Sequence, residues 1–124
     1  MRILNIEDDT LKHNDICRVI NSSVLAEIDW VKTLDEGTRL IMDSIENNQL
    51  YDLIITDMYF PLKAGAVESK AGDLLIKRMI QYKIPIPVIL FSTVDYDYPD
   101  IWGCLHYSDH SPWKEELKKL LEKL

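Results

Sequence analysis

Short apolar runs alternate with longer segments of helical periodicity along this chain. The apolar runs predict five strands, which span residues 2–6, 26–31, 51–57, 87–92 and 103–107. The third and fourth of them are uninterrupted, which is typical of central parallel strands that are covered on both faces. The second alternates between polar and apolar residues, which is typical of an edge strand.

Helical spacing of apolar residues fills most of the segments between these strands. It predicts helices at residues 10–22, 34–48, 72–82 and 112–124. In the first helix we expect Thr10 as the N-cap and the inward-facing residues to be Leu11, Ile16, Val19 and Ile20. In the last helix we expect Ser111 as the N-cap and Pro112 as the first helical residue.

Two segments carry no clear periodicity. Residues 58–71 contain Pro61, Gly65 and several charged residues, and we expect a long loop there. Residues 93–102 are polar and interrupted by proline, so we expect at most one short helix.

Strands that alternate with helices favour βαβ units, whose right-handed crossovers build a parallel sheet with helices on both faces. The sequence therefore predicts a single α/β domain over residues 1–124, with a doubly wound five-stranded sheet and a shortened fourth helix. Such folds hold their chemistry beyond the carboxyl ends of the strands. The residues that end each strand are the first candidates for function.

The composition excludes several functional classes. The 124 residues include 14 Lys or Arg and 21 Asp or Glu, which gives a formal net charge of −7. An acidic surface repels nucleic-acid backbones and anionic lipid headgroups, so we expect neither as a partner. The amino-terminal residues lack the features of a signal or transit peptide. Cys17 and Cys104 lack metal-ligand spacing and lie within apolar segments, so we expect reduced thiols in the core of a cytoplasmic protein.

Polar side chains end three of the predicted strands. Glu7 and Asp8 follow the first strand, Asp57 ends the third, and Ser92 ends the fourth. In a doubly wound sheet these strands are neighbours, so the side chains should converge. Clustered carboxylates repel one another unless a proton or a cation intervenes, and Mg²⁺ prefers such oxygen ligands. The arrangement predicts Asp57 as a nucleophile for phosphoryl transfer, with Ser92 placed to hydrogen-bond the transferred group.

These motifs resemble the receiver domain of bacterial two-component response regulators. The resemblance covers residues 3–9, Asp57 with Pro61 four residues later, and residues 87–93, in the order that the family has them. It implies a flavodoxin-like sheet of order 2-1-3-4-5. It also implies that Asp57 accepts a phosphoryl group from a sensor histidine kinase or a phosphotransfer protein. The implied Mg²⁺ ligands are Glu7, Asp8, Asp57 and the backbone carbonyl of Tyr59. Ser92 takes the place of the switch hydroxyl and Tyr107 that of the switch aromatic.

The chain departs from the family in four places. The family has a lysine directly after the fifth strand, but the alignment places His110 or Ser111 there, and the nearest lysine, Lys114, falls inside the predicted last helix. Lys63 or Lys70 could reach back from the long loop. That loop is roughly seven residues longer than usual. The fourth helix is shortened or missing, and Thr93 stands where the family prefers a smaller residue.

The first hypothesis is a stand-alone receiver without an effector domain, and without enzymatic activity beyond slow self-dephosphorylation. Its output would be contact with a downstream protein through residues 93–113, which is also where receivers form homodimers. The aromatic residues there are equally compatible with a docking surface and with rings packed on the core. The alternative is a pseudo-receiver that binds partners without phosphorylation. An aspartate-nucleophile phosphatase is disfavoured, because Tyr59 stands where its second carboxylate would be.

Overall fold

The computed structural model describes all 124 residues and contains the predicted five-stranded sheet. Its strands are β1 (Arg2–Ile6), β2 (Glu27–Val31), β3 (Leu53–Thr56), β6 (Val88–Ser92) and β7 (Gly103–His106). They pair in the order β2-β1-β3-β6-β7, and every pair is parallel. In order of appearance this is 2-1-3-4-5, so the predicted flavodoxin-like topology is confirmed.

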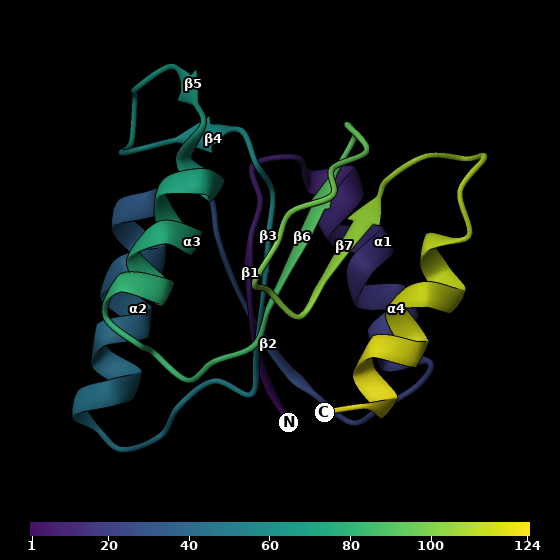
Figure 1. The fold of residues 1–124 in the computed structure, drawn as a ribbon, viewed down its shortest axis with the longest axis horizontal. Helices are drawn as coiled ribbons and strands as arrows, with labels where there is room; N and C mark the ends of the chain where they lie inside the picture. Colours follow the sequence, from purple (N-terminus) through teal and green to yellow (C-terminus); the bar gives the residue numbers. More distant parts are fainter.

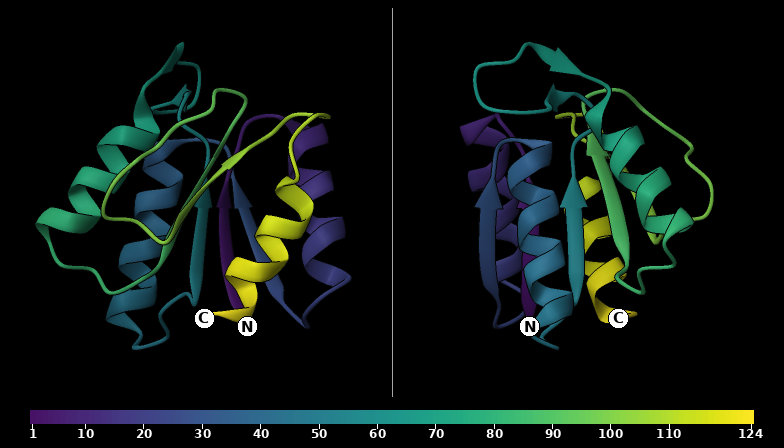
Figure 2. Two further views of the ribbon diagram at one scale, coloured as in Figure 1. Left: turned by 45° about the vertical axis from the view of Figure 1, so that its right-hand side comes forward. Right: turned by 90° about the vertical axis from the view of Figure 1, so that its left-hand side faces the viewer.

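Four helices cover the two faces of the sheet (Figures 1 and 2). They are α1 (Thr10–Asn21), α2 (Leu34–Glu46), α3 (Ala71–Gln81) and α4 (Trp113–Glu122). Helices α2 and α3 lie on one face, and α1 and α4 lie on the other. The core divides accordingly, because successive residues of a strand point to opposite faces. Ile3 belongs to the cluster under α1 and α4, and Leu4 belongs to the cluster under α2 and α3.

Helix α1 turns a different face to the sheet than the sequence predicted. Its N-cap is Asp9 rather than Thr10, and the Asp9 carboxylate accepts hydrogen bonds from the backbone of Leu11 and Lys12. Ile16, Val19 and Ile20 are buried as expected, but Leu11 is 73% exposed and Lys12 is only 2% exposed. The prediction for Leu11 was therefore wrong, because its position is out of phase with the buried residues of the helix.

The last helix also begins later than expected. Its N-cap is Pro112, not Ser111, and Trp113 is its first residue. The Ser111 hydroxyl donates instead to the carbonyl of His106, which ties the loop to the end of β7.

Residues 93–102 form no helix at all, so the fourth helix is absent rather than shortened. The segment is held by polar contacts with its neighbours. The Tyr98 hydroxyl donates to Asp73 of α3 at 2.6 Å, and the Tyr98 N–H donates to the sulfur of Cys104 at 3.3 Å. Tyr96 and Tyr98 pack against the core, which favours the interpretation of this aromatic stretch as packed rings.

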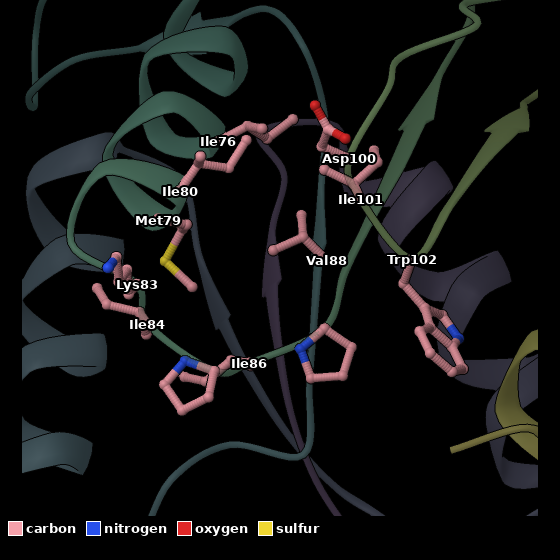
Figure 3. A pocket seen from close by; sticks show the side chains of 12 residues that line it. Ile76, Met79, Ile80, Lys83, Ile84, Ile86, Val88, Asp100, Ile101 and Trp102 are labelled. Atoms are coloured by element: carbon pink, nitrogen blue, oxygen red, sulfur yellow. The ribbon is translucent and has the colours of Figure 1, made fainter.

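An apolar pocket of about 500 Å³ lies between α3 and this segment. Figure 3 shows Ile76, Met79 and Ile80 of α3 on one side and Ile101 and Trp102 on the other. With no helix over residues 93–102, this part of α3 faces an irregular segment of bends and turns instead.

The expected long loop contains a small hairpin. Strands β4 (Phe60–Pro61) and β5 (Glu68–Ser69) pair antiparallel, and Gly65 has a φ of 81° between them. Phe60 is fully buried and anchors the hairpin to the domain. Figure 1 shows that the hairpin rises beyond the carboxyl ends of the central strands, next to α3.

None of the helices combines the length and the apolar composition that are needed to cross a bilayer. Both cysteines are free thiols and only half-buried, which is less burial than expected of core thiols.

Gly72 allows the start of α3 to approach the backbone of Asp57 and Met58, which follow β3. A Cβ at Gly72 would lie 2.2 Å from the backbone oxygen of Asp57 and 2.8 Å from the Cα of Met58. We expect Gly72→Ala to lower the free energy of unfolding by about 2 kcal/mol in urea denaturation, because backbone cannot give way as a side chain can. Gly37→Ala is the control, because its Cβ would meet only the movable side-chain end of Ile6 among atoms closer than 3.0 Å. Equal effects of the two variants would contradict this prediction.

Candidate functional site

Three carboxylates meet where β1 and β3 end. Glu7, Asp8 and Asp57 each place one oxygen so that all three oxygens lie within 4.8 Å of one another. Strand pairing causes this: Ile6 lies opposite Thr56, and the Asp57 N–H donates to the Ile6 carbonyl at 3.1 Å. The residues that follow these two strands are therefore neighbours. The acidic cluster expected from the strand ends is present.

Glu7 is the most buried member of this cluster. Its side chain is 1% exposed; Oε2 has no polar partner, and Oε1 has only an ion pair with Lys12. Burial raises the pKa of Glu7 to about 8. The charge of Lys12 lowers this pKa and that of Asp57 raises it, but both effects are smaller than that of burial.

A buried lysine that sequence reasoning did not select lies at the centre of the site. The Lys12 ammonium is 3.1 Å from Glu7 Oε1 and 3.3 Å from Asp57 Oδ1, and it donates to the Phe91 carbonyl. It also lies 5.1 Å from the centroid of the Phe91 ring and 5.8 Å from that of Tyr107. These contacts fix one positive charge among the carboxylates.

The position of Lys12 does have a signal in the sequence. Residues 12, 16, 19 and 20 follow the spacing of one helical face, and the last three are apolar. A lysine on the inward face of an amphipathic helix requires a partner for its charge. Glu7 and Asp8, which precede Lys12 by five and four residues, supply candidates.

None of the replacements considered for the missing lysine contacts the cluster. Lys63, Lys70 and His110 are exposed, and Ser111 is bonded to the His106 carbonyl. Lys12 alone forms ion pairs with Glu7 and Asp57. The cation of this site therefore comes from α1 and not from the end of the sheet's last strand.

Ser92 lies at the end of β6 and is 3% exposed. Its Oγ accepts a hydrogen bond from the Val94 N–H at 3.2 Å, and its own proton is not given to any protein acceptor. It can therefore still donate to another group.

Tyr107 is a packed ring bonded to α1. Its hydroxyl donates to Asp15 Oδ2 at 2.5 Å, and this bond raises the pKa of Tyr107 to about 12, with burial adding to the shift. The ring packs edge-on against Phe91 at 5.4 Å and also against Trp113. Tyr59, whose carbonyl was expected to bind metal, has a side chain that is 43% exposed.

The hairpin adds an acidic residue that the sequence analysis did not select. Glu68 of β5 lies beside Asp8, and hydrogen bonding to Asp8 raises the pKa of Glu68. The insertion thus increases the negative charge around the cluster.

A second layer of side chains supports the end of β1. The Trp30 indole donates to the Glu7 carbonyl at 2.6 Å and stacks on the ring of His13 at 4.0 Å. His13 contacts Asn5 at 2.7 Å, and burial lowers the pKa of His13. No role was expected for His13, and its contacts are those of a structural residue.

The residues present fit a hard divalent cation. Every ligand candidate in the cluster is a carboxylate oxygen, and Glu7 Oε2 is buried without a partner. With all three carboxylates ionised, Lys12 leaves two negative charges uncompensated. A divalent ion would balance them, and oxygen ligands are those that Mg²⁺ prefers.

The raised pKa of Glu7 predicts how stability depends on pH without metal. In the unfolded chain Glu7 ionises at about 4.5, but in the folded protein it keeps its proton up to about 8. The folded state therefore binds more protons between these values, and the free energy of unfolding should fall as pH rises from 4.5 to 8. Urea denaturation in the presence of EDTA measures this slope. We expect a flatter slope in Glu7→Gln and an unchanged one in the exposed control Glu27→Gln; equal slopes in all three proteins would contradict the assignment.

No model of a protein family matches this sequence, and no curated protein sequence does. Solved structures do match it over nearly its full length. The response regulatory domain of protein mrkE from Klebsiella pneumoniae has a TM-score of 0.70 and 14% identity, covering 100% of this chain and 94% of that one. A signal receiver domain of a putative Luxo repressor protein from Vibrio parahaemolyticus has a TM-score of 0.69 and 20% identity, covering 98% and 87%.

A third match comes from a structure that contains a metal. The Mn²⁺-bound form of response regulator Rcp1 has a TM-score of 0.66 and 17% identity, covering 98% of this chain and 89% of that one. All these identities are low, so the likeness concerns the fold. The chain has the fold of response regulator receiver domains.

Proposed function

We propose that this protein is a signalling receiver that accepts a phosphoryl group on Asp57. The observation that carries the proposal is the cluster of Glu7, Asp8 and Asp57 at the carboxyl ends of β1 and β3, in a domain with the receiver fold. Asp57 is 18% exposed, whereas Glu7 is 1% exposed. Asp57 is therefore open to a phosphoryl donor while Glu7 is not.

The donor would be a histidine kinase or a phosphotransfer protein. An Asp57 carboxylate oxygen attacks phosphorus, the bond between phosphorus and the donor's imidazole nitrogen breaks, and the imidazole takes a proton from water. Glu7, Asp8 and Asp57, with the Tyr59 carbonyl, would hold Mg²⁺. When bound, the ion supplies positive charge for the oxygens of the phosphoryl group.

Two other residues take supporting roles in this proposal. Ser92 has a free hydroxyl proton, which can be donated to a phosphoryl oxygen. Tyr107 connects the end of β7 to α1 through Asp15, so a change at the site can reach that helix. Hydrolysis of the aspartyl phosphate would be slow self-dephosphorylation and would reset the signal.

The output would be contact with another protein in the cytoplasm, through residues 93–113 or through a second copy of the chain. Trp102 is 38% exposed at this surface, and aromatic side chains are frequent interface anchors. Tyr96 and Tyr98 are packed on the domain instead, so Trp102 is the better candidate for a contact.

A pseudo-receiver is the second candidate. The absent helix at residues 93–102 favours it, because the segment that replaces the helix is remodelled. The retained acidic cluster argues against it, because repulsion between grouped carboxylates lowers the stability of the fold, and a module that only binds partners does not require such a cluster.

Incubation with acetyl phosphate and Mg²⁺, followed by intact-mass measurement, tests phosphorylation. We expect a phosphoryl adduct on the wild-type protein and on the exposed control Asp95→Asn, and none on Asp57→Asn, because the amide cannot act as the nucleophile. Omission of Mg²⁺ should slow adduct formation at least tenfold.

Absence of the adduct from a wild-type protein that still binds Mg²⁺ would reject the phosphorylation cycle in favour of the pseudo-receiver. In that case Asp57→Asn should leave partner binding unchanged. An adduct that persists in Asp57→Asn would place the phosphoryl group on another residue.

A further inference from the structure

We propose that Lys12 is the phosphoryl-binding cation of this site, supplied by α1. This inference rests on the proposed phosphorylation of Asp57. A residue of the first helix would then supply the positive charge at Asp57, which no residue of the long loop or of the end of β7 supplies.

The contacts of the ammonium match its donor capacity. A lysine ammonium has three N–H donors, and Lys12 has Glu7 Oε1, Asp57 Oδ1 and the Phe91 carbonyl around it. The side chain is 2% exposed, so the ammonium is already stripped of water and held in one place. The free-energy cost of ordering and desolvating the Lys12 ammonium is therefore part of folding and is not added when a phosphoryl group binds.

The hydrogen bonds also distinguish the two oxygens of Asp57. Oδ1 faces Lys12 at 3.3 Å and accepts from the Met58 N–H at 2.7 Å. Oδ2 has no protein partner, which leaves it as the attacking oxygen. Attack through Oδ2 forms the O–P bond while Lys12 remains beside Oδ1, next to the new phosphoryl oxygens.

The change in charge favours a cation at this position. Before transfer, Asp57 carries one negative charge; afterwards it is an uncharged acyl group, joined in an acyl phosphate to a phosphoryl group of about two negative charges. The buried end of the site thus gains negative charge beside Glu7. The remaining ion pairs of the protein join Arg18 to Asp15, Arg39 to Asp43 and Lys77 to Asp73, and none of them includes Asp57 or Glu7.

The rate of adduct formation with acetyl phosphate and saturating Mg²⁺ tests the role of Lys12. We expect Lys12→Met to lower this rate about a hundredfold, as loss of a preorganised charge does at such sites. The matched control Lys63→Met, on the hairpin loop, should keep the wild-type rate. Isothermal titration calorimetry measures Mg²⁺ binding in the same samples.

A purely structural role for Lys12 gives a different pattern. If Lys12 only neutralised Glu7, Lys12→Met would change Mg²⁺ binding and stability but would keep the wild-type rate once saturated with Mg²⁺. That result, in a variant shown by circular dichroism to be folded, overturns the proposal. Mg²⁺ binding that is retained or tightened, together with loss of the adduct, supports it.

A measurement on the wild-type protein covers the case in which Lys12→Met does not fold. The buried ammonium should give a protected nitrogen resonance in lysine-labelled protein, and we expect that resonance to shift when the adduct forms. An unshifted resonance overturns the proposal. If the wild-type protein forms no adduct, the proposed phosphorylation of Asp57 is itself rejected. If the wild-type protein forms the adduct and Lys12→Met forms it at the same rate, only the role proposed for Lys12 is rejected.

Discussion

The ion-pair network around Lys12 is the constraint on which the rest of the site depends. Carboxylates that converge at the end of a buried sheet repel one another, and in a medium of low polarity this repulsion is costly. The ammonium of Lys12 offsets part of it by contacting Glu7 and Asp57 together. The Phe91 carbonyl, at the end of β6, completes the set of partners and joins a third strand to the network. Helix α1 is thereby fixed to β1, β3 and β6 by charge as well as by apolar packing.

Much of the fold follows from the sequence because the strong signals are local. Burial is visible in the apolar runs of β3 and β6 and in the helical spacing of apolar residues in α2 and α3. The strand order follows from the resemblance to receiver domains. The convergence of Glu7, Asp8 and Asp57 also follows, because neighbouring parallel strands end at the same edge. These predictions need no knowledge of side-chain partners.

The features that were missed depend on tertiary partners. Lys12 is a polar residue in a buried position, and only the folded site shows which carboxylates receive its charge. In the non-helical segment 93–102, Tyr98 bonds to Asp73 of α3 and to Cys104 of β7, and the sequence does not reveal these partners. The hairpin of β4 and β5 is anchored by the burial of Phe60, which a loop-like composition does not reveal.

The source of the cation has a consequence for how the site assembles. Glu7, Asp8 and Lys12 lie within six residues of one another, in the loop that follows β1 and in the first turn of α1. Contacts between residues close in sequence cost little loop-closure entropy and can form early in folding. Three of the four charged groups therefore belong to a single βα unit, and only Asp57 arrives through a long-range pairing. A lysine beyond β7 would have required the last strand to dock before the acidic groups were compensated.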